Sequence, residues 1–169
     1  MEPEVHIIEK YLQETQSLFT ITNIRLKGGK EIDLLAIDAS GKNRYHIECR
    51  IATERSFRLS LGDAPKKGLD YLIKRKFNDP RVSSHVKSIF KSDDYSKVLV
   101  VWDVQNEKVI EDAKKRGIEI WLMRDILKEL NLNIRCKGYR DDILRTIELM
   151  GKEERKKPLY SLSMVRERE

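Results

Sequence analysis

Several features are scarce in this chain of 169 residues, and each scarcity excludes a class of protein. The two cysteines, Cys49 and Cys136, are too few and too far apart for a structural zinc site or a disulfide framework. No apolar run approaches the roughly 20 residues that cross a bilayer. The opening residues also lack the charged and then apolar order of a signal peptide. We therefore expect a cytoplasmic protein that makes no membrane contact.

The motifs of several common enzyme classes are also missing. The sequence contains no glycine-rich phosphate loop, no HExxH and no GxSxG, so nucleotide hydrolases, metalloproteases of that type and serine hydrolases have no support. Charge, in contrast, is abundant: 37% of the residues are charged and 40% are hydrophobic. This composition supplies enough apolar material for a core and leaves a strongly charged surface.

The positive charge is concentrated in one stretch. The whole chain carries +6, and residues 50–81 hold nine basic residues against four acidic ones. A clustered excess of this kind favours a polyanion such as nucleic acid, because each neutralised phosphate releases condensed counterions. A solvated basic helix would have the same composition. The side chains that we expect to bind nucleic acid are Arg55, Arg58, Lys66, Lys67 and Lys74.

Hydrophobic periodicity predicts a helix followed by three strands in the first third of the chain. The expected helix covers residues 4–16, and the expected strands cover 18–26, 31–38 and 44–52. Glycine-containing turns separate the strands, which favours an antiparallel meander.

The rest of the chain alternates helices with apolar strands. We expect helices over residues 64–77, 106–116, 124–132 and 141–152, and buried strands over 97–104 and 118–123. Two apolar strands around one helix form a βαβ unit with parallel strands. The predicted fold class is therefore α/β, with helices flanking a mixed central sheet.

We expect a single domain over residues 1–150 and a C-terminal tail over 151–169. Within the tail, residues 159–165 (LYSLSMV) alternate in part between apolar residues and serine. Such a segment either pairs as a late strand, docks on a partner subunit as a dimer contact, or is held only by packing between molecules.

Three charged residues in the predicted hairpin need an explanation. Asp33 lies in an apolar strand, where an acidic residue is costly unless something pairs with it. Glu48 and Arg50 are two residues apart in the next strand, so their side chains share one face. If the register brings Asp33 beside Glu48, the two carboxylates could hold a hard cation such as Mg²⁺, with Arg50 beside a phosphate. The alternative is a Glu48 to Arg50 surface pair with Asp33 facing solvent.

The segments GGKEIDLLAI (28–37) and HIECRI (46–51) resemble the PD-(D/E)xK nuclease superfamily. The likeness is strongest to its archaeal Holliday junction resolvase and Mrr-like restriction endonuclease branches. It covers about residues 4–104 and implies a restriction-endonuclease-like core in the order α-β-β-β-α-β. It also implies that Asp33 and Glu48 are metal ligands, with the Cys49 carbonyl as a third. An acidic residue of the first helix, Glu4 with Glu9 behind it, would complete the site.

The sequence departs from the family pattern at Arg50, where the family usually has lysine. Arginine is always protonated and cannot accept a proton from water, but it can hold a phosphate. Lys66 or Lys67 of the following helix could supply the missing ammonium. His46 shares the face of Glu48 and either assists proton transfer or, more commonly at the start of a strand, lies at the surface. Trp102 lies in an apolar strand and is expected to pack.

These observations predict a Mg²⁺-dependent or Mn²⁺-dependent DNA endonuclease that hydrolyses phosphodiester bonds. Asp33, Glu48 and Arg50 would form its catalytic site. The alternative is a noncatalytic module that keeps the nuclease fold and binds nucleic acid or a protein partner. A homodimer is also expected, because cutting two strands needs two sites.

Overall fold

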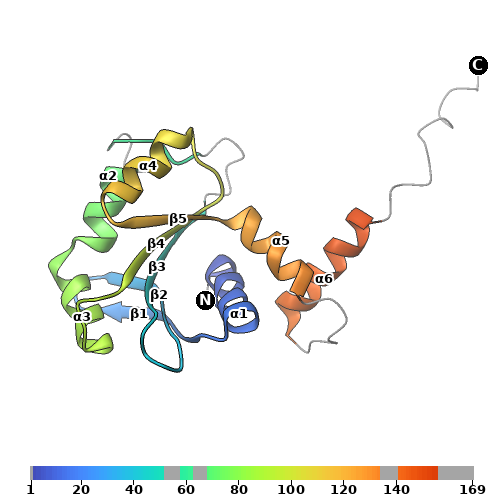
Figure 1. The fold of residues 1–169 in the computed structure, drawn as a ribbon, viewed down its shortest axis with the longest axis horizontal. Helices are drawn as coiled ribbons and strands as arrows, with labels where there is room; N and C mark the ends of the chain where they lie inside the picture. Colours follow the sequence, from blue (N-terminus) through green and yellow to red (C-terminus); the bar gives the residue numbers. More distant parts are fainter. Residues whose placement is uncertain (1, 52–57, 63–67, 134–140, 156–169) are drawn as a thin grey trace, which may run out of the picture.

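The structure is a computed structural model that describes residues 2–51, 58–62, 68–133 and 141–155 (Figure 1). Its elements, in chain order, are α1 (Pro3–Gln16), β1 (Phe19–Leu26), β2 (Lys30–Ile37), β3 (Arg44–Arg50), α2 (Leu69–Leu72), a π-helical turn η1 (Ile73–Phe77), α3 (Pro80–Phe90), β4 (Ser96–Val101), α4 (Glu107–Lys115), β5 (Ile118–Leu122), α5 (Met123–Asn133) and α6 (Asp142–Arg155). None of the helices in these ranges is long and apolar enough to cross a membrane.

The strands form one mixed sheet in the order β1-β2-β3-β4-β5. The pairs β1–β2 and β2–β3 are antiparallel, whereas β3–β4 and β4–β5 are parallel. The expected meander and βαβ unit are therefore confirmed. The α-β-β-β-α-β order and the α/β class with helices flanking a mixed sheet are confirmed as well.

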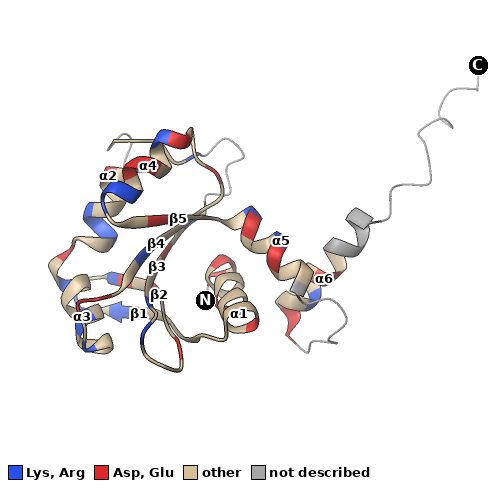
Figure 2. Ribbon diagram, viewed as in Figure 1, with Lys and Arg blue, Asp and Glu red and all other residues tan. Residues whose placement is uncertain are grey.

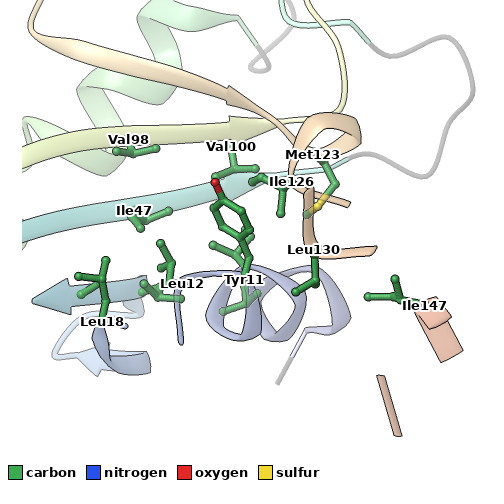
Figure 3. Packing of buried hydrophobic residues seen from close by; sticks show 14 of the residues in the cluster. Tyr11, Leu12, Leu18, Ile47, Val98, Val100, Met123, Ile126, Leu130 and Ile147 are labelled. Carbon is green, nitrogen blue, oxygen red and sulfur yellow. The ribbon is translucent and has the colours of Figure 1, made fainter. Parts of the chain in front are cut away.

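The larger core lies between the sheet and helices α1, α5 and α6. Figure 3 shows Leu12 of α1 near Ile47 of β3 and Val98 of β4, with residues of α5 alongside. These positions are buried because β3 and β4 alternate their side chains, so that Ile47, Val98 and Val100 all face α1. Helix α1 thus holds one face of the sheet in place.

The opposite face of the sheet packs against η1, α3 and α4. Phe77 of η1 and Val109 of α4 are buried with Leu99 and Val101 of β4. Helix α3 forms a third cluster, in which Val82, Val86 and Phe90 meet Ile32 and Leu35 of β2. In Figure 1, α2 and α4 lie on the far side of the sheet from α1.

The hairpin register places the two acidic strand residues opposite each other. Leu34 pairs with Ile47 in the β2–β3 ladder, so the next position along places Asp33 opposite Glu48. On its other side, Asp33 faces Asn23 of β1, whose φ of 53° lies in the left-handed region. Asparagine is one of the few residues that adopt this conformation readily. The β1–β2 ladder is therefore locally interrupted beside Asp33.

The sequence analysis missed one helix, and its expectation for one tryptophan was wrong. Helix α3 was not predicted, although Asp79 caps it by accepting a hydrogen bond from the Arg81 N–H at 3.0 Å and Pro80 occupies its first turn. Trp102 was expected to pack in a strand, but β4 ends at Val101 and the Trp102 side chain is 46% exposed. The described part of the predicted helix 64–77 is divided between α2 and η1.

Candidate active site

The pairing between β2 and β3 ends at Asp33. Its carboxylate Oδ2 accepts a hydrogen bond from the Cys49 N–H at 2.8 Å. The last pair of the β2–β3 ladder is Leu34 with Ile47. Just beyond it, the Asp33 carboxylate accepts the hydrogen bond that a backbone carbonyl would accept if the ladder continued. This bond fixes the orientation of the Asp33 carboxylate toward β3.

Glu48 is fully buried and hydrogen-bonded to a buried histidine. Its Oε1 lies 2.8 Å from Nε2 of His46, and both side chains are 0% exposed. The ring of Phe77 lies edge-on to the His46 ring with 5.0 Å between the ring centres, and the centre of the Tyr95 ring lies 6.3 Å away. The expectation of a surface histidine was therefore wrong, because elements distant in sequence cover it.

The cation of this cluster is Lys76, which η1 directs at both carboxylates. Its Nζ lies 2.6 Å from Glu48 Oε2 and donates a hydrogen bond to Asp33 Oδ1 at 3.1 Å. The Asn78 N–H bonds to the Ile73 carbonyl at 2.9 Å, the wide spacing of a π-helical turn. Such turns often occur at functional sites. Here the turn presents Lys76 and Phe77 to the sheet and leaves Lys74 exposed.

Burial and charge shift the protonation of all three groups. Burial and then the neighbouring Asp33 raise the pKa of Glu48 well above its ordinary value. Burial, Lys97 and Lys76 lower the pKa of His46 to about 3, so the ring is neutral at neutral pH. Burial opposes the charged form of Lys76, but Glu48 and Asp33 outweigh it and raise the pKa of the ammonium.

Two of the groups present, the Asp33 and Glu48 carboxylates, are of the kind that a hard divalent cation prefers. Two carboxylates face each other, and the Lys76 ammonium already occupies the space between them. Within the described ranges, no three His, Cys, Asp or Glu side chains could hold a metal ion together. Mg²⁺, however, is commonly bound by one or two carboxylates with water and substrate phosphates. Asp33 and Glu48 would be those carboxylates, and Lys76 would compete with the cation for them.

The other residues expected at the metal are placed as follows. Glu4 lies half-buried in the first turn of α1. Burial, then the charges of Asp33 and Glu4, raise the pKa of the Cys49 thiol. No hydrogen bond or ion pair links Glu4 to Asp33 or Glu48 in the part of the chain that the structure describes. The metal-binding roles of Glu4 and of the Cys49 carbonyl stay predictions.

Arg50 does not form the surface pair with Glu48 that was the alternative. Glu48 is buried and pairs with Lys76 instead. Arg50 lies at the end of β3 opposite Val101 of β4, and its buried Nε has no hydrogen-bond partner among the described residues. A buried donor without a partner is costly unless a ligand or water satisfies it. The role of Arg50 as a phosphate clamp stays a prediction.

The basic residues expected to bind nucleic acid divide into two groups. Lys74 is exposed on η1, and the Arg58 side chain is 63% exposed, with its Nε 3.1 Å from Asp103. Arg55, Lys66 and Lys67 lie outside the described residues, as do Cys136 and the tail segment 159–165. Figure 2 shows the blue of lysine and arginine on the segment after α2 and at the end of β1.

Lys76 is the site residue that the sequence analysis did not single out. It was counted in the basic stretch, and Lys66 or Lys67 was expected to provide the ammonium instead. The sequence carried only a weak signal for Lys76. It precedes Phe77, and a lysine next to a core aromatic residue lies near the buried face of a helix. The π-helical turn, which changes the helical spacing, is not readable from the sequence.

Comparisons with known proteins found a similar fold among solved structures. No family model matches the chain, and no curated protein matches its sequence. A crystal structure described as a protein of unknown function, AF1548, has a TM-score of 0.54 at 18% identity and covers 90% of this chain and 91% of its own. A repair endonuclease from Pyrococcus abyssi has a TM-score of 0.42 at 15% identity, over 69% of this chain and 45% of that one. The AF1548 likeness shows a shared fold and nothing about activity.

Proposed function

We propose that this protein is a metal-dependent DNA endonuclease of the PD-(D/E)xK type. The observation that carries the proposal is the convergence of Asp33, Glu48 and Lys76 at one point between the sheet and η1. Two carboxylates and an ammonium are the groups that phosphodiester hydrolysis needs: ligands for a divalent cation and a donor for the phosphate. The basic character of the chain and the expected α-β-β-β-α-β core agree with this function.

Each residue has a distinct task in this proposal. Asp33 and Glu48 would hold Mg²⁺ or Mn²⁺, which would supply charge neutralisation and activation of a water molecule. Burial and Asp33 raise the pKa of Glu48, and a bound cation would oppose that shift by favouring the carboxylate. His46 orients the Glu48 carboxylate through Nε2, and the Cys49 N–H orients that of Asp33. Arg50 clamps the phosphate from the strand end.

Lys76 takes the part of the lysine that the family usually places at position 50. Its raised pKa keeps it an ammonium, so it cannot accept a proton from water. It can instead donate a hydrogen bond to a phosphate oxygen as negative charge develops there. Hydrolysis then joins a water oxygen to phosphorus and breaks one P–O ester bond. The attacking water gives up a proton to the solvent and the departing ester oxygen takes one up from it, which leaves a phosphate monoester and an alcohol.

The first test is DNA binding as a function of salt. We expect affinity for a short duplex, measured in EDTA by fluorescence anisotropy, to fall steeply as salt rises. The log-log slope should be about −0.9 for each phosphate contact, because every contact releases counterions. Cleavage of the same duplex should require added Mg²⁺ or Mn²⁺. An affinity independent of salt would remove nucleic acid as the partner.

Arg50→Lys separates an active nuclease from a noncatalytic module. We expect the variant to cleave DNA at least as well as the wild type, because a lysine at this position is what the family normally uses and Lys76 is untouched. Cleavage rates with Mg²⁺ and with Mn²⁺ are the measurement. No cleavage by either protein, with DNA binding intact, would favour the noncatalytic module. An active wild type inactivated by Arg50→Lys would refute the assigned role, since bidentate geometry would then matter more than charge.

A further inference from the structure

A surface hollow of about 360 Å³ lies between the β1–β2 turn and α3. Leu26 and Lys27 line it from the turn side. The residues that line it from the helix are Arg81, Ser84, His85 and Ser88. Apart from Leu26, every one of these side chains can donate a hydrogen bond, and no carboxylate is among them. The lining therefore suits an anion.

The helix presents these four residues as one stripe. Their spacing of three, four and seven residues places them on one face of α3, whereas Val82, Val86 and Phe90 bury a different face against β2. Seven residues of helix extend about 10 Å, so the stripe is longer than a single phosphate. The polar stripe is thus a groove wall beside the turn rather than part of the core.

The turn is held close to the helix. Gly28 has a φ of 82°, and a Cβ there would lie 2.7 Å from Nη1 of Arg81. Only glycine allows this approach without displacing the Arg81 side chain. Lys30, at the start of β2, pairs with Asp79 at the start of α3, with Nζ 2.8 Å from Oδ2. The two walls of the hollow are therefore joined at their base.

Nearby acidic residues neutralise only part of the positive charge of the basic side chains around the hollow. Asp79 pairs with Lys30 at 2.8 Å and with the Arg81 guanidinium at 3.2 Å. One carboxylate is thus shared by two cations. In the described part of the chain, the Lys27 ammonium and the His85 ring form no ion pair or hydrogen bond with another side chain. Ser88 already donates its hydroxyl to the His85 carbonyl at 2.7 Å, so the donors that remain include the Lys27 ammonium, the His85 ring and Nη1 of Arg81. The hollow thus keeps a net positive charge.

We propose that this hollow binds a backbone phosphate of the DNA strand that enters the candidate active site. The inference rests on the proposed nuclease function and adds a place for the substrate. Phosphates are bound in proteins by lysine, arginine and serine side chains, which are the residue types on both walls. Leu26, which lines the hollow, pairs with Lys30, and Lys30 lies three residues from Asp33 on β2, so the hollow lies about 10 Å along the strand from the catalytic carboxylates. The contacted phosphate is therefore within a few nucleotides of the scissile one on the same strand.

The test compares Lys27→Met, His85→Gln and their double variant with Lys42→Met. Lys42 is exposed in the β2–β3 turn, at the other end of β2, and its replacement removes the same charge as Lys27→Met. Duplex binding is measured in EDTA across a salt titration, with thermal unfolding to verify the fold. We expect Lys27→Met to weaken binding several-fold and to reduce the log-log salt slope by about 0.9. Lys42→Met should change neither quantity.

A second arm locates the phosphate. Neutral methylphosphonate linkages are placed one at a time along one strand, and each duplex is titrated against the wild type and the double variant. We expect one linkage, within a few nucleotides of the cut, to weaken binding to the wild type and to leave the double variant unaffected. If the wild type bound DNA and every hollow variant had the same affinity and salt slope as the wild type, this inference would be overturned. The proposed nuclease function would not be affected.

Two other outcomes are decisive. Wild-type protein that binds no DNA would overturn both this inference and the proposed function. Inorganic phosphate that shifts the His85 ring resonances, with DNA affinity equal in wild type and variants, would assign the hollow to a free anion. That result would overturn the DNA assignment while leaving nuclease activity to be judged by cleavage.

Discussion

Lys76→Met is expected to lower the rate of DNA cleavage by about 100-fold to 1000-fold, the usual cost of removing one donor that stabilises developing charge. The side chain loses its ammonium but keeps its length, so the contact of η1 with the sheet is preserved. DNA affinity in EDTA should fall only slightly, because Lys76 is turned toward the two carboxylates rather than toward the surface. Cleavage rates at saturating Mg²⁺ provide the measurement.

The same variant should bind divalent cations more tightly than the wild type does. Without Lys76, Asp33 and buried Glu48 face each other with no compensating cation. We expect a loss of about 1 to 3 kcal/mol in the free energy of unfolding without metal, because the buried carboxylate loses its partner. Mg²⁺ or Mn²⁺ should restore this loss and raise the melting temperature more in the variant than in the wild type.

Lys74→Met is the matched control for these measurements. It removes the same charge from the same turn, but Lys74 is exposed and touches neither carboxylate. Its cleavage rate should be close to that of the wild type, with DNA binding modestly weaker. If Lys76→Met cleaved DNA as fast as Lys74→Met, Lys76 would have no part in catalysis.

Local patterns in the sequence were sufficient to single out the two carboxylates that the structure brings together, and their role as metal ligands stays a prediction. An acidic residue inside an apolar strand is costly, which singled out Asp33, and strand alternation placed Glu48 and Arg50 on one face. The sequence left open whether the register brings Asp33 beside Glu48, and the observed pairing of Leu34 with Ile47 does so. These inferences depend on neighbours within one hairpin, where backbone geometry dictates which side chains meet.

Contacts between distant elements could not be predicted in the same way. His46 is buried because Phe77 and Tyr95, about thirty and fifty positions further along, close over it. Lys76 reaches Asp33 across 43 positions, through a π-helical turn that helical periodicity does not indicate. The signals for α3, by contrast, were present: Asp79 and Pro80 are a common helix start. That helix could have been predicted from the sequence.

Removing either carboxylate should have the largest effect on activity. For Asp33→Asn and Glu48→Gln we expect a loss of cleavage on the order of 1000-fold or more, because each removes an anionic ligand and with it several kcal/mol of transition-state stabilisation. Binding to DNA in EDTA should be equal or slightly tighter, since each variant removes one negative charge. Both variants should fold, because the amide oxygen introduced by Asp33→Asn can still accept the Cys49 N–H and Glu48→Gln ends the repulsion between two carboxylates.

Glu31→Gln is the control for this pair. Glu31 is exposed on the same strand, two residues from Asp33, and its loss changes the net charge equally. Its cleavage rate should match the wild type, which would separate loss of a ligand from a general change in charge. Calorimetry with Mn²⁺ gives a second readout, because both carboxylate variants should lose the metal-binding heat that Glu31→Gln retains. Equal cleavage by the wild type and by both carboxylate variants would mean that catalysis, if present, takes place elsewhere on the chain.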